Sequence, residues 1–364
     1  MAHRPGIYGH QRFRWNGPVA GIRQAPGLGQ RTQAAGTLVP GASRTYAFLG
    51  PEGTFTEAAL LQVPDALQAV RLPASNVNAA LDKVRDGSAD AAMVPIENSV
   101  EGGVTATLDA IAAGQELRII REVLVPISFV LVARSGVRLA DVRRVSTHGH
   151  AWAQCRLWMD QNIPDAEYVP GSSTAASAVG LLDGDCHYDA AICAPLVARE
   201  QAGLSILAEN IGDNPAAVTR FVLVSRPHAL PARTGADKTT VVVPLPEDRP
   251  GALMEILDQF ASRGVNLSRI ESRPTGQYLG HYFFSIDADG HAGEARVADA
   301  LAGLHRISPA TRFLGSYPRA DRQGTLVPAH TSDDAFAAAR TWVESILTAE
   351  SVAGESGSGA SPKA

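Results

Sequence analysis

The sequence predicts an α/β protein with two related α/β halves, followed by a smaller domain of order βαββαβ. Apolar runs typical of strands alternate with helical segments through residues 45–226, which favours parallel sheets. Within that region, residues 81–95 and 181–195 share one pattern, a helix end, Asp-Gly, then Ala-Ala and a short strand that ends at Pro. From residue 238 the order changes to βαββαβ, the ferredoxin-like pattern. The 364 residues allow two or three domains of that kind.

The first half begins with a short apolar run, YAFLG, which is typical of a buried strand. Thr54 and Glu57 then have the S/T-x-x-E spacing of a capping box and are followed by an apolar stretch, which predicts a helix. A polar, Gly-containing loop before a helix presents N–H donors to anions. The Gly spacing matches neither common nucleotide-binding motif, so a nucleotide is not indicated.

Residues 227–237 contain Pro and Gly and few apolar residues, and we expect a linker there. In the domain expected over 238–320, Pro250 stands at a plausible first helical position. The apolar face of that helix is expected to comprise Leu253, Ile256, Leu257 and Phe260. A further amphipathic helix is expected over 331–348, packed on the small domain or on a partner chain.

The two ends of the chain differ from its body in composition. Residues 1–44 hold six Arg and no acidic residue and are rich in Gly and Pro, which predicts a flexible leader. Residues 351–364 are rich in Gly and Ser and predict a flexible tail. The body is acidic, which argues against nucleic acid as a partner, and no apolar run is long enough to cross a membrane. No secretory signal is evident, and three Cys without paired spacing suit the cytoplasm.

Polar residues gather in loops at the expected strand ends, and several of these loops precede helices. Such loops are rich in Ser, Thr, Asn and Gly, so together they offer many neutral hydrogen-bond donors to one cleft. A small polycarboxylate would need such donors, with an Arg for bidentate pairing. The loops are GPEGTFTE (50–57), PIENSVEGG (95–103), STHGH (146–150), GSSTAASA (171–178) and NPAAVTRF (214–221).

Other chemistries find less support in the sequence. His148 and His150 have no Cys or carboxylate at ligand spacing nearby, so no metal site is expected. No G-x-S-x-G elbow is present. Cys155 lies in AWAQCRLWM, which predicts a helix whose Cys packs inward, so a Cys nucleophile is disfavoured.

Five motifs follow one another between about residues 45 and 318, namely YAFLGPEGTFTEAAL, VPIENSVEGGVTATLDAI, GSSTAASA, NPAAVTRF and GALMEILDQFASRGVNLSRIESRP. In these motifs and their order the chain resembles prephenate dehydratase with a C-terminal ACT regulatory domain. It implies conversion of prephenate to phenylpyruvate, water and CO2 in phenylalanine biosynthesis, with feedback control by phenylalanine and no cofactor. It also implies a two-lobed catalytic domain like type II periplasmic binding proteins.

The resemblance assigns roles to residues by motif. Thr219 in the TRF motif would be catalytic, donating a hydrogen bond to the leaving oxygen. Arg220 would pair with a substrate carboxylate or form a structural ion pair, and Glu97 would act as an acid or as a buried orienting group. The residues implied to bind substrate are Thr54, Phe55, Glu97, Asn98, Ser99, Thr174, Arg220 and Phe221. Those implied to bind phenylalanine are Gly251, Ala252, Leu253, Asn266, Leu267, Glu271, Ser272, Arg273 and Pro274.

One residue departs from the family pattern, because His150 stands where the family commonly has Gln. A free His titrates near pH 6.5, so activity could gain an acidic limb. Two alternatives stay open beside prephenate dehydratase, namely arogenate dehydratase and a non-catalytic amino-acid sensor. ACT domains usually pair side by side, so we expect a homodimer or homotetramer.

Overall fold

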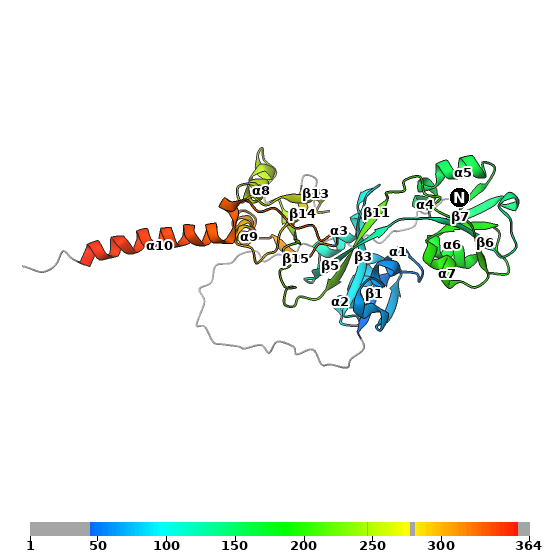
Figure 1. The fold of residues 1–364 in the computed structure, drawn as a ribbon, viewed down its shortest axis with the longest axis horizontal. Helices are drawn as coiled ribbons and strands as arrows, with labels where there is room; N and C mark the ends of the chain where they lie inside the picture. The colour runs from blue at the N-terminus through cyan, green and yellow to red at the C-terminus, as the bar shows by residue number, and fades with distance from the viewer. Residues whose placement is uncertain (1–43, 246, 277–280, 356–364) are drawn as a thin grey trace, which may run out of the picture. The chain divides into compact units, whose positions relative to one another are not determined.

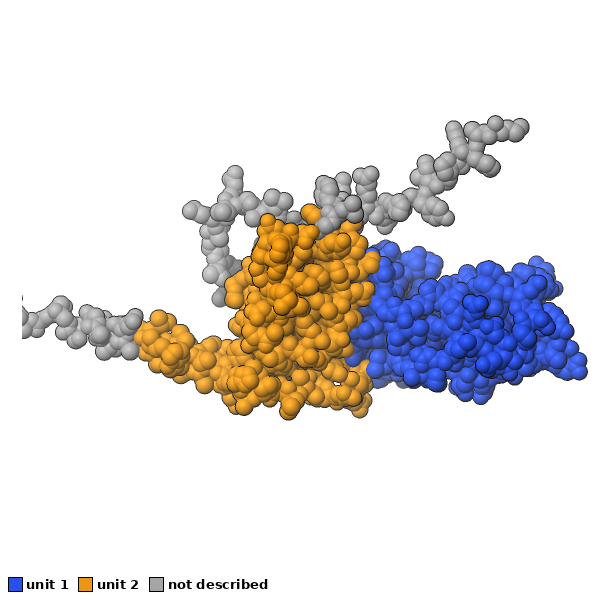
Figure 2. Space-filling model, turned by 90° about the horizontal axis from the view of Figure 1, so that it is seen from above, with its two compact units in different colours: residues 1–230 blue, residues 231–364 orange. Residues whose placement is uncertain are grey.

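The computed structural model describes residues 44–245, 247–276 and 281–355. The chain divides into two compact units, residues 1–230 and 231–364, coloured separately in Figure 2. Most of the predicted leader (1–43) and the end of the predicted tail (356–364) lie outside the described residues. Among the described residues, no helix has the length and apolar character needed to cross a membrane.

Two mixed sheets form the two lobes of the first unit (Figure 1). The first sheet has the order β2-β1-β3-β11-β5, with the two-residue β4 beside β3. Strands β1, β2 and β3 run parallel, whereas β11 is antiparallel to both of its neighbours. These strands are β1 (Thr45–Leu49), β2 (Val70–Ala74), β3 (Ala91–Asn98), β4 (Gly102–Gly103), β5 (Arg118–Pro126) and β11 (Val218–Ser225).

The second sheet has the order β10-β6-β9-β7-β8, and its strands β7, β8 and β9 run parallel. Strand β6 is antiparallel to β9 and β10. The strands are β6 (Val130–Arg134), β7 (Arg144–Thr147), β8 (Glu167–Pro170), β9 (Ala190–Cys193) and β10 (Leu204–Ala208). Each sheet therefore contains one strand that the chain adds directly after it crosses from the other lobe. This strand is β11 in the first sheet and β6 in the second.

The internal repeat predicted from the sequence is visible in this topology. Strands β3 and β9, which end the two repeat copies, hold the same place in their sheets, between a parallel neighbour and the inserted antiparallel strand. The prediction of two related α/β halves is confirmed. The helices of the unit are α1 (Phe55–Leu60), α2 (Val77–Arg85), α3 (Thr105–Ala112), α4 (Gly149–Gln154), α5 (Arg156–Asn162), α6 (Thr174–Gly180) and α7 (Pro195–Glu200), with 3₁₀ turns η1 (Pro64–Leu67) and η2 (Leu139–Asp141).

The capping box predicted at α1 is confirmed. Thr54 Oγ1 accepts a hydrogen bond from the backbone N–H of Glu57 at 3.4 Å. The Glu57 carboxylate in turn accepts from the backbone N–H of Gly53 at 2.6 Å, one residue before the cap. The first turn of α1 is thus held by two reciprocal bonds, which places the polar loop at the end of β1.

The single helix predicted around Cys155 is wrong, because the structure has two helices, α4 and α5, that meet at Cys155. The carboxylate of Asp213 accepts from the backbone N–H groups of Leu157 and Trp158, at 3.2 and 3.3 Å. Asp213, which is distant in the sequence, therefore accepts hydrogen bonds from the first turn of α5. The residues around Cys155 alone do not indicate that a second helix begins there. Cys155 itself is buried, as predicted.

The second unit has the predicted order βαββαβ. Its four strands form an antiparallel sheet of order β13-β14-β12-β15. Val241, Val243, Phe284 and Ile286 on the sheet pack with Ile256 and Phe260 of α8 in one core. The elements are β12 (Asp237–Pro244), α8 (Ala252–Ala261), β13 (Leu267–Pro274), β14 (Tyr282–Asp289), α9 (Ala295–Ile307) and β15 (Arg312–Pro318).

Two details of this unit differ from the sequence expectation. Helix α8 begins at Ala252, after Gly251 in a left-handed conformation (φ +87°), so Pro250 precedes the helix instead of starting it. Leu253, expected on the buried face, is 37% exposed. After the 3₁₀ turn η3 (Ala329–Thr331), helix α10 runs over Asp333–Glu355, so its last turn lies in the segment expected to be a tail. Its apolar residues Trp342, Val343, Ile346 and Leu347 are exposed.

Candidate active site

A cavity of about 340 Å³ lies between the two lobes of the first unit. Residues from both lobes and from all five of the polar loops singled out in the sequence line it, so the prediction that these loops share one cleft is confirmed. The lining residues are Leu49, Gly50, Thr54, Phe55, Thr56, Ser75, Pro95, Asn98, Ile127, Phe129, His148, His150, Ala151, Gln154, Ser172, Ser173, Thr174, Thr219 and Phe221.

Thr219 and Asn98 face the cavity from neighbouring strands. Both residues are directly paired in the antiparallel ladder of β11 and β3. The side-chain amide of Asn98 donates a hydrogen bond to Thr219 Oγ1 at 3.2 Å. Thr219 is buried, and its hydroxyl keeps a proton to donate, because a hydroxyl that accepts one bond can still give another.

Three helices begin at the wall of this cavity. Thr54 caps α1, Ser173 caps α6 and His148 caps α4, each through a side-chain atom that accepts from a backbone N–H. The first turns of such helices carry partial positive charge. No Lys, Arg, Asp or Glu is among the described residues that line the cavity. The cavity therefore offers an anion neutral donors instead of a fixed cation.

One wall of the cavity is apolar. Phe55 of α1 and Phe129 pack edge to face, with ring centroids 5.5 Å apart. Ile127 and Phe221 extend this wall. The sequence reasoning missed Ile127 and Phe129, which lie in the segment that crosses from β5 to β6. The largely apolar run VPISFVLVA at this crossing, which contains one polar residue, Ser128, was the available signal, although nothing in it distinguishes a binding wall from a core strand.

Three residues expected to bind substrate are not among those lining the cavity, namely Glu97, Ser99 and Arg220. Successive strand residues point to opposite faces, so Arg220 points away from the face that carries Thr219 and Phe221. Its Nε lies 2.6 Å from the carboxylate of Glu122 and its Nη1 lies 3.3 Å from that of Glu97. Arg220 therefore forms an ion pair inside the lobe, which favours the structural role left open from the sequence, and its pairing with a substrate carboxylate stays a prediction. Arg220 and Glu122 are both buried.

Ser99 lies outside the cavity and stabilises the backbone next to it. Its Oγ accepts from the backbone N–H of Val218 at 3.0 Å, and its own N–H donates to the carbonyl of Val218 at 2.9 Å. These two bonds tie the end of β3 to the start of β11, one residue before Thr219. Ser99 is therefore placed to fix the backbone that carries Thr219.

Two histidines stand at the edge of the cavity. The rings of His148 and His150 are stacked with centroids 5.1 Å apart. Burial lowers the pKa of His148, and the neighbouring His150 lowers it further, while Glu101 acts in the opposite direction. Nδ1 of His148 accepts from the N–H of His150, so the neutral ring carries its proton on Nε2.

Burial raises the pKa of the Cys155 thiol, which keeps it a thiol in the core. No group of three or more His, Cys, Asp or Glu among the described residues could hold a metal ion.

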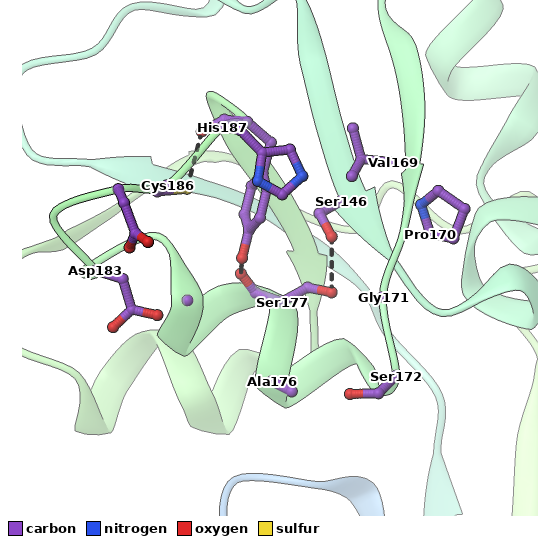
Figure 3. Close-up of a pocket in the computed structure, with 13 residues that line it drawn as sticks. Ser146, Val169, Pro170, Gly171, Ser172, Ala176, Ser177, Asp183, Cys186 and His187 are labelled. Carbon is purple, nitrogen blue, oxygen red and sulfur yellow. Dashed lines mark hydrogen bonds between the residues drawn. The ribbon is translucent and has the colours of Figure 1, made fainter.

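A second cavity of about 350 Å³ lies within the second lobe and contains none of the predicted site residues. Figure 3 shows Ser146 facing Ser177 inside it, joined by a 3.0 Å hydrogen bond.

The residues expected to bind phenylalanine occupy two places in the second unit. Gly251, Ala252 and Leu253 form the start of α8, with Gly251 held left-handed by the backbone. Asn266 precedes β13, where its amide donates to Asp289 at 2.7 Å. The remaining residues lie on β13, the edge strand of the sheet, which pairs with β14 alone within the described sheet. They are Leu267, Glu271, Ser272, Arg273 and Pro274.

The fold defines a protein with a cavity between two α/β lobes and a separate ferredoxin-like unit. Residues 46–229 match the family model described as prephenate dehydratase, and residues 239–306 match the ACT domain model. The chain belongs to the prephenate dehydratase family. It is 45% identical over 309 residues to prephenate dehydratase of Amycolatopsis methanolica, covering 84% of this chain and 98% of that one.

Two solved structures extend the comparison. A prephenate dehydratase from Arthrobacter aurescens in complex with L-Phe is 79% identical, covers 84% of this chain and 99% of that one, and has a TM-score of 0.81. A protein described as a quorum-quenching acylase is 32% identical, covers 77% of this chain and 100% of that one, and has a TM-score of 0.68. Because this fold carries more than one described activity, the activity must be argued from the site.

Proposed function

We propose that the cavity between the lobes is where this prephenate dehydratase converts prephenate to phenylpyruvate, water and CO2. The observation that carries this proposal is the convergence of Thr219, Asn98 and three helix starts on one cavity without charged side chains. Prephenate is a dianion that becomes aromatic when it loses the ring carboxylate and the ring hydroxyl. Its conversion needs an anion-binding cavity and a proton donor, with no metal or redox group.

The reaction balances with one proton taken up. The bond between the ring and its carboxylate breaks and releases CO2, and the electron pair moves through the ring. The carbon–oxygen bond opposite then breaks, and the departing oxygen takes a proton and leaves as water. Thr219 donates to that oxygen and regains its proton from solvent, while Asn98 holds the Thr219 hydroxyl in place.

The remaining features of the cavity suit the rest of the substrate. The N–H groups and hydroxyls around Thr54, Ser173 and Thr174 would receive the carboxylates, because donors set before binding stabilise negative charge without reorganisation. The edge-to-face pair Phe55–Phe129 would pack against the ring. We assign Glu97 and Ser99 to positioning, since both hold strands that carry Thr219 or Asn98.

Turnover of prephenate and arogenate, measured side by side, tests this assignment. Faster conversion of prephenate supports the proposal, whereas a preference for arogenate would assign the protein to the sister activity. Absence of turnover on both would favour a non-catalytic sensor. The two substrates differ only in a keto or amino group, so this comparison of rates distinguishes the two activities.

The second unit is proposed to bind phenylalanine as the feedback inhibitor. The support is the ACT model match and the 79% identical relative solved with L-Phe. The start of α8 and strand β13 carry the residues we assign to this site. Because β13 is an edge strand, a second chain could extend the sheet there, and we propose a homodimer or homotetramer in the cytoplasm. Sedimentation with and without phenylalanine measures the oligomer.

A further inference from the structure

One hydrogen bond joins the two lobes next to the cavity. Glu101 lies in the loop between β3 and β4 of the first lobe, and His150 lies in α4 of the second lobe. Glu101 Oε1 and His150 Nδ1 are 2.5 Å apart. His150 also lines the cavity and stacks on His148.

Glu101 and His150 both lie on short segments that hydrogen bonds between side chains and backbone hold in place. Asn98 Oδ1 accepts from the N–H of Val100 at 2.7 Å, which shapes the loop that leads to Glu101. The same Asn98 donates to Thr219, so this loop and the proposed proton donor share one support. On the other lobe, His148 caps α4 and accepts from the N–H of His150 at 3.4 Å. The pair is therefore a contact between two ordered segments.

We propose that the Glu101–His150 bond is a clasp that closes the substrate cavity by holding the two lobes together. Lobes joined by two crossing segments open and close about those segments, and closure excludes water from the reaction. The side chains of His150 and Glu101 are 63% and 42% exposed, so water competes for the bond. A clasp of this strength can break at each turnover to admit substrate and release product.

Glu101 and His150 are positioning residues in this proposal, which rests on the proposed function for its kinetic readout. Glu101→Ala and His150→Ala should each raise KM for prephenate roughly threefold to tenfold, as expected for loss of a partly exposed hydrogen bond, and change kcat less than twofold. The double variant should match the single variants, because either change alone removes the whole clasp. His150→Gln keeps a donor and should recover part of the loss. Glu116→Ala, which removes a 60% exposed carboxylate from the same lobe, should leave KM unchanged.

A second measurement, hydrogen–deuterium exchange, tests the clasp without measuring turnover. In hydrogen–deuterium exchange of the full chain, His150→Ala should speed exchange in residues 99–103 of the other lobe, and Glu101→Ala should speed exchange at the start of α4. Unchanged exchange across the cleft in both variants overturns the clasp, as does an unchanged KM in both. Effects of the two changes that multiply in the double variant would show independent roles and also overturn it. If the unaltered protein fails to convert prephenate, the proposed function fails, and the exchange result still decides the clasp.

Discussion

The side-chain amide of Asn98 donates a hydrogen bond to the hydroxyl of Thr219 at 3.2 Å, across two antiparallel strands. The two residues are 121 positions apart in the sequence, and they meet because β11 returns from the second lobe to pair with β3. The proposed proton donor therefore lies on β11, the strand by which the chain returns from the second lobe to the first.

Removal of the Thr219 hydroxyl should lower kcat on prephenate by roughly 10²–10⁴-fold, the range typical of general acid catalysis. Thr219→Val keeps the shape and removes the proton donor, whereas Thr219→Ser keeps the hydroxyl and should retain much of the activity. Steady-state kinetics measures both, and a thermal melt of each variant checks folding. Turnover of Thr219→Val within tenfold of the original rate would rule out Thr219 as the donor.

Replacement of Arg220 should affect stability more than substrate binding. Arg220→Met would leave the buried carboxylate of Glu122 without its guanidinium partner, which should lower the free energy of unfolding by about 3–5 kcal/mol. Denaturant titration measures this loss. Glu97→Gln is the milder comparison, because Glu97 is 37% exposed and lies farther from the guanidinium, at 3.3 Å.

The alternative role of Arg220 makes the opposite prediction. If Arg220 pairs with a substrate carboxylate, Arg220→Lys should raise KM strongly while the stability stays near that of the original protein. A pH–rate profile of Glu97→Gln that loses a limb would likewise return Glu97 to the role of an acid.

Strand and helix periods are local signals, so the sequence was sufficient to predict the βαββαβ order of the second unit and the alternation of strands and helices in the first, although not the break between α4 and α5. It was also sufficient to predict that five loops share a cleft, because the polar loops at strand ends belong to two related α/β halves, and a cleft is expected between such halves. Which residue of a strand faces the cleft was not predictable. Thr219 and Arg220 are adjacent in one motif, yet the ladder turns Thr219 to the cavity and Arg220 to Glu122. The break at Cys155 was missed for a related reason, because Asp213 reaches α5 from another part of the chain.

The lowered pKa of His148 predicts how stability depends on pH. Burial and the nearby His150 hold this pKa below its usual value of 6.5, so between the two values the unfolded chain binds more protons than the folded one. The contribution of His148 to stability should therefore be constant above about pH 6.5, and it should decrease as the pH falls below that value. Urea midpoints at several pH values measure this slope. His148→Asn should reduce this slope, so a slope that is unchanged in this variant would contradict the assignment.

The conformation of Gly251 provides the test of the phenylalanine site. Its φ of +87° is strained for any residue with a Cβ, although no heavy atom beyond the adjoining residues lies within 4 Å of where that Cβ would stand. Gly251→Val should therefore change the turn before α8 and abolish phenylalanine binding and inhibition, with uninhibited kcat unchanged. Gly251→Asn should retain part of the binding, because Asn tolerates the left-handed region better. Gly235→Val is the matched control, since Gly235 has φ +84°, equally open space and a place outside the proposed site. Calorimetry of phenylalanine binding separates the three, and full inhibition of Gly251→Val would remove the start of α8 from the site.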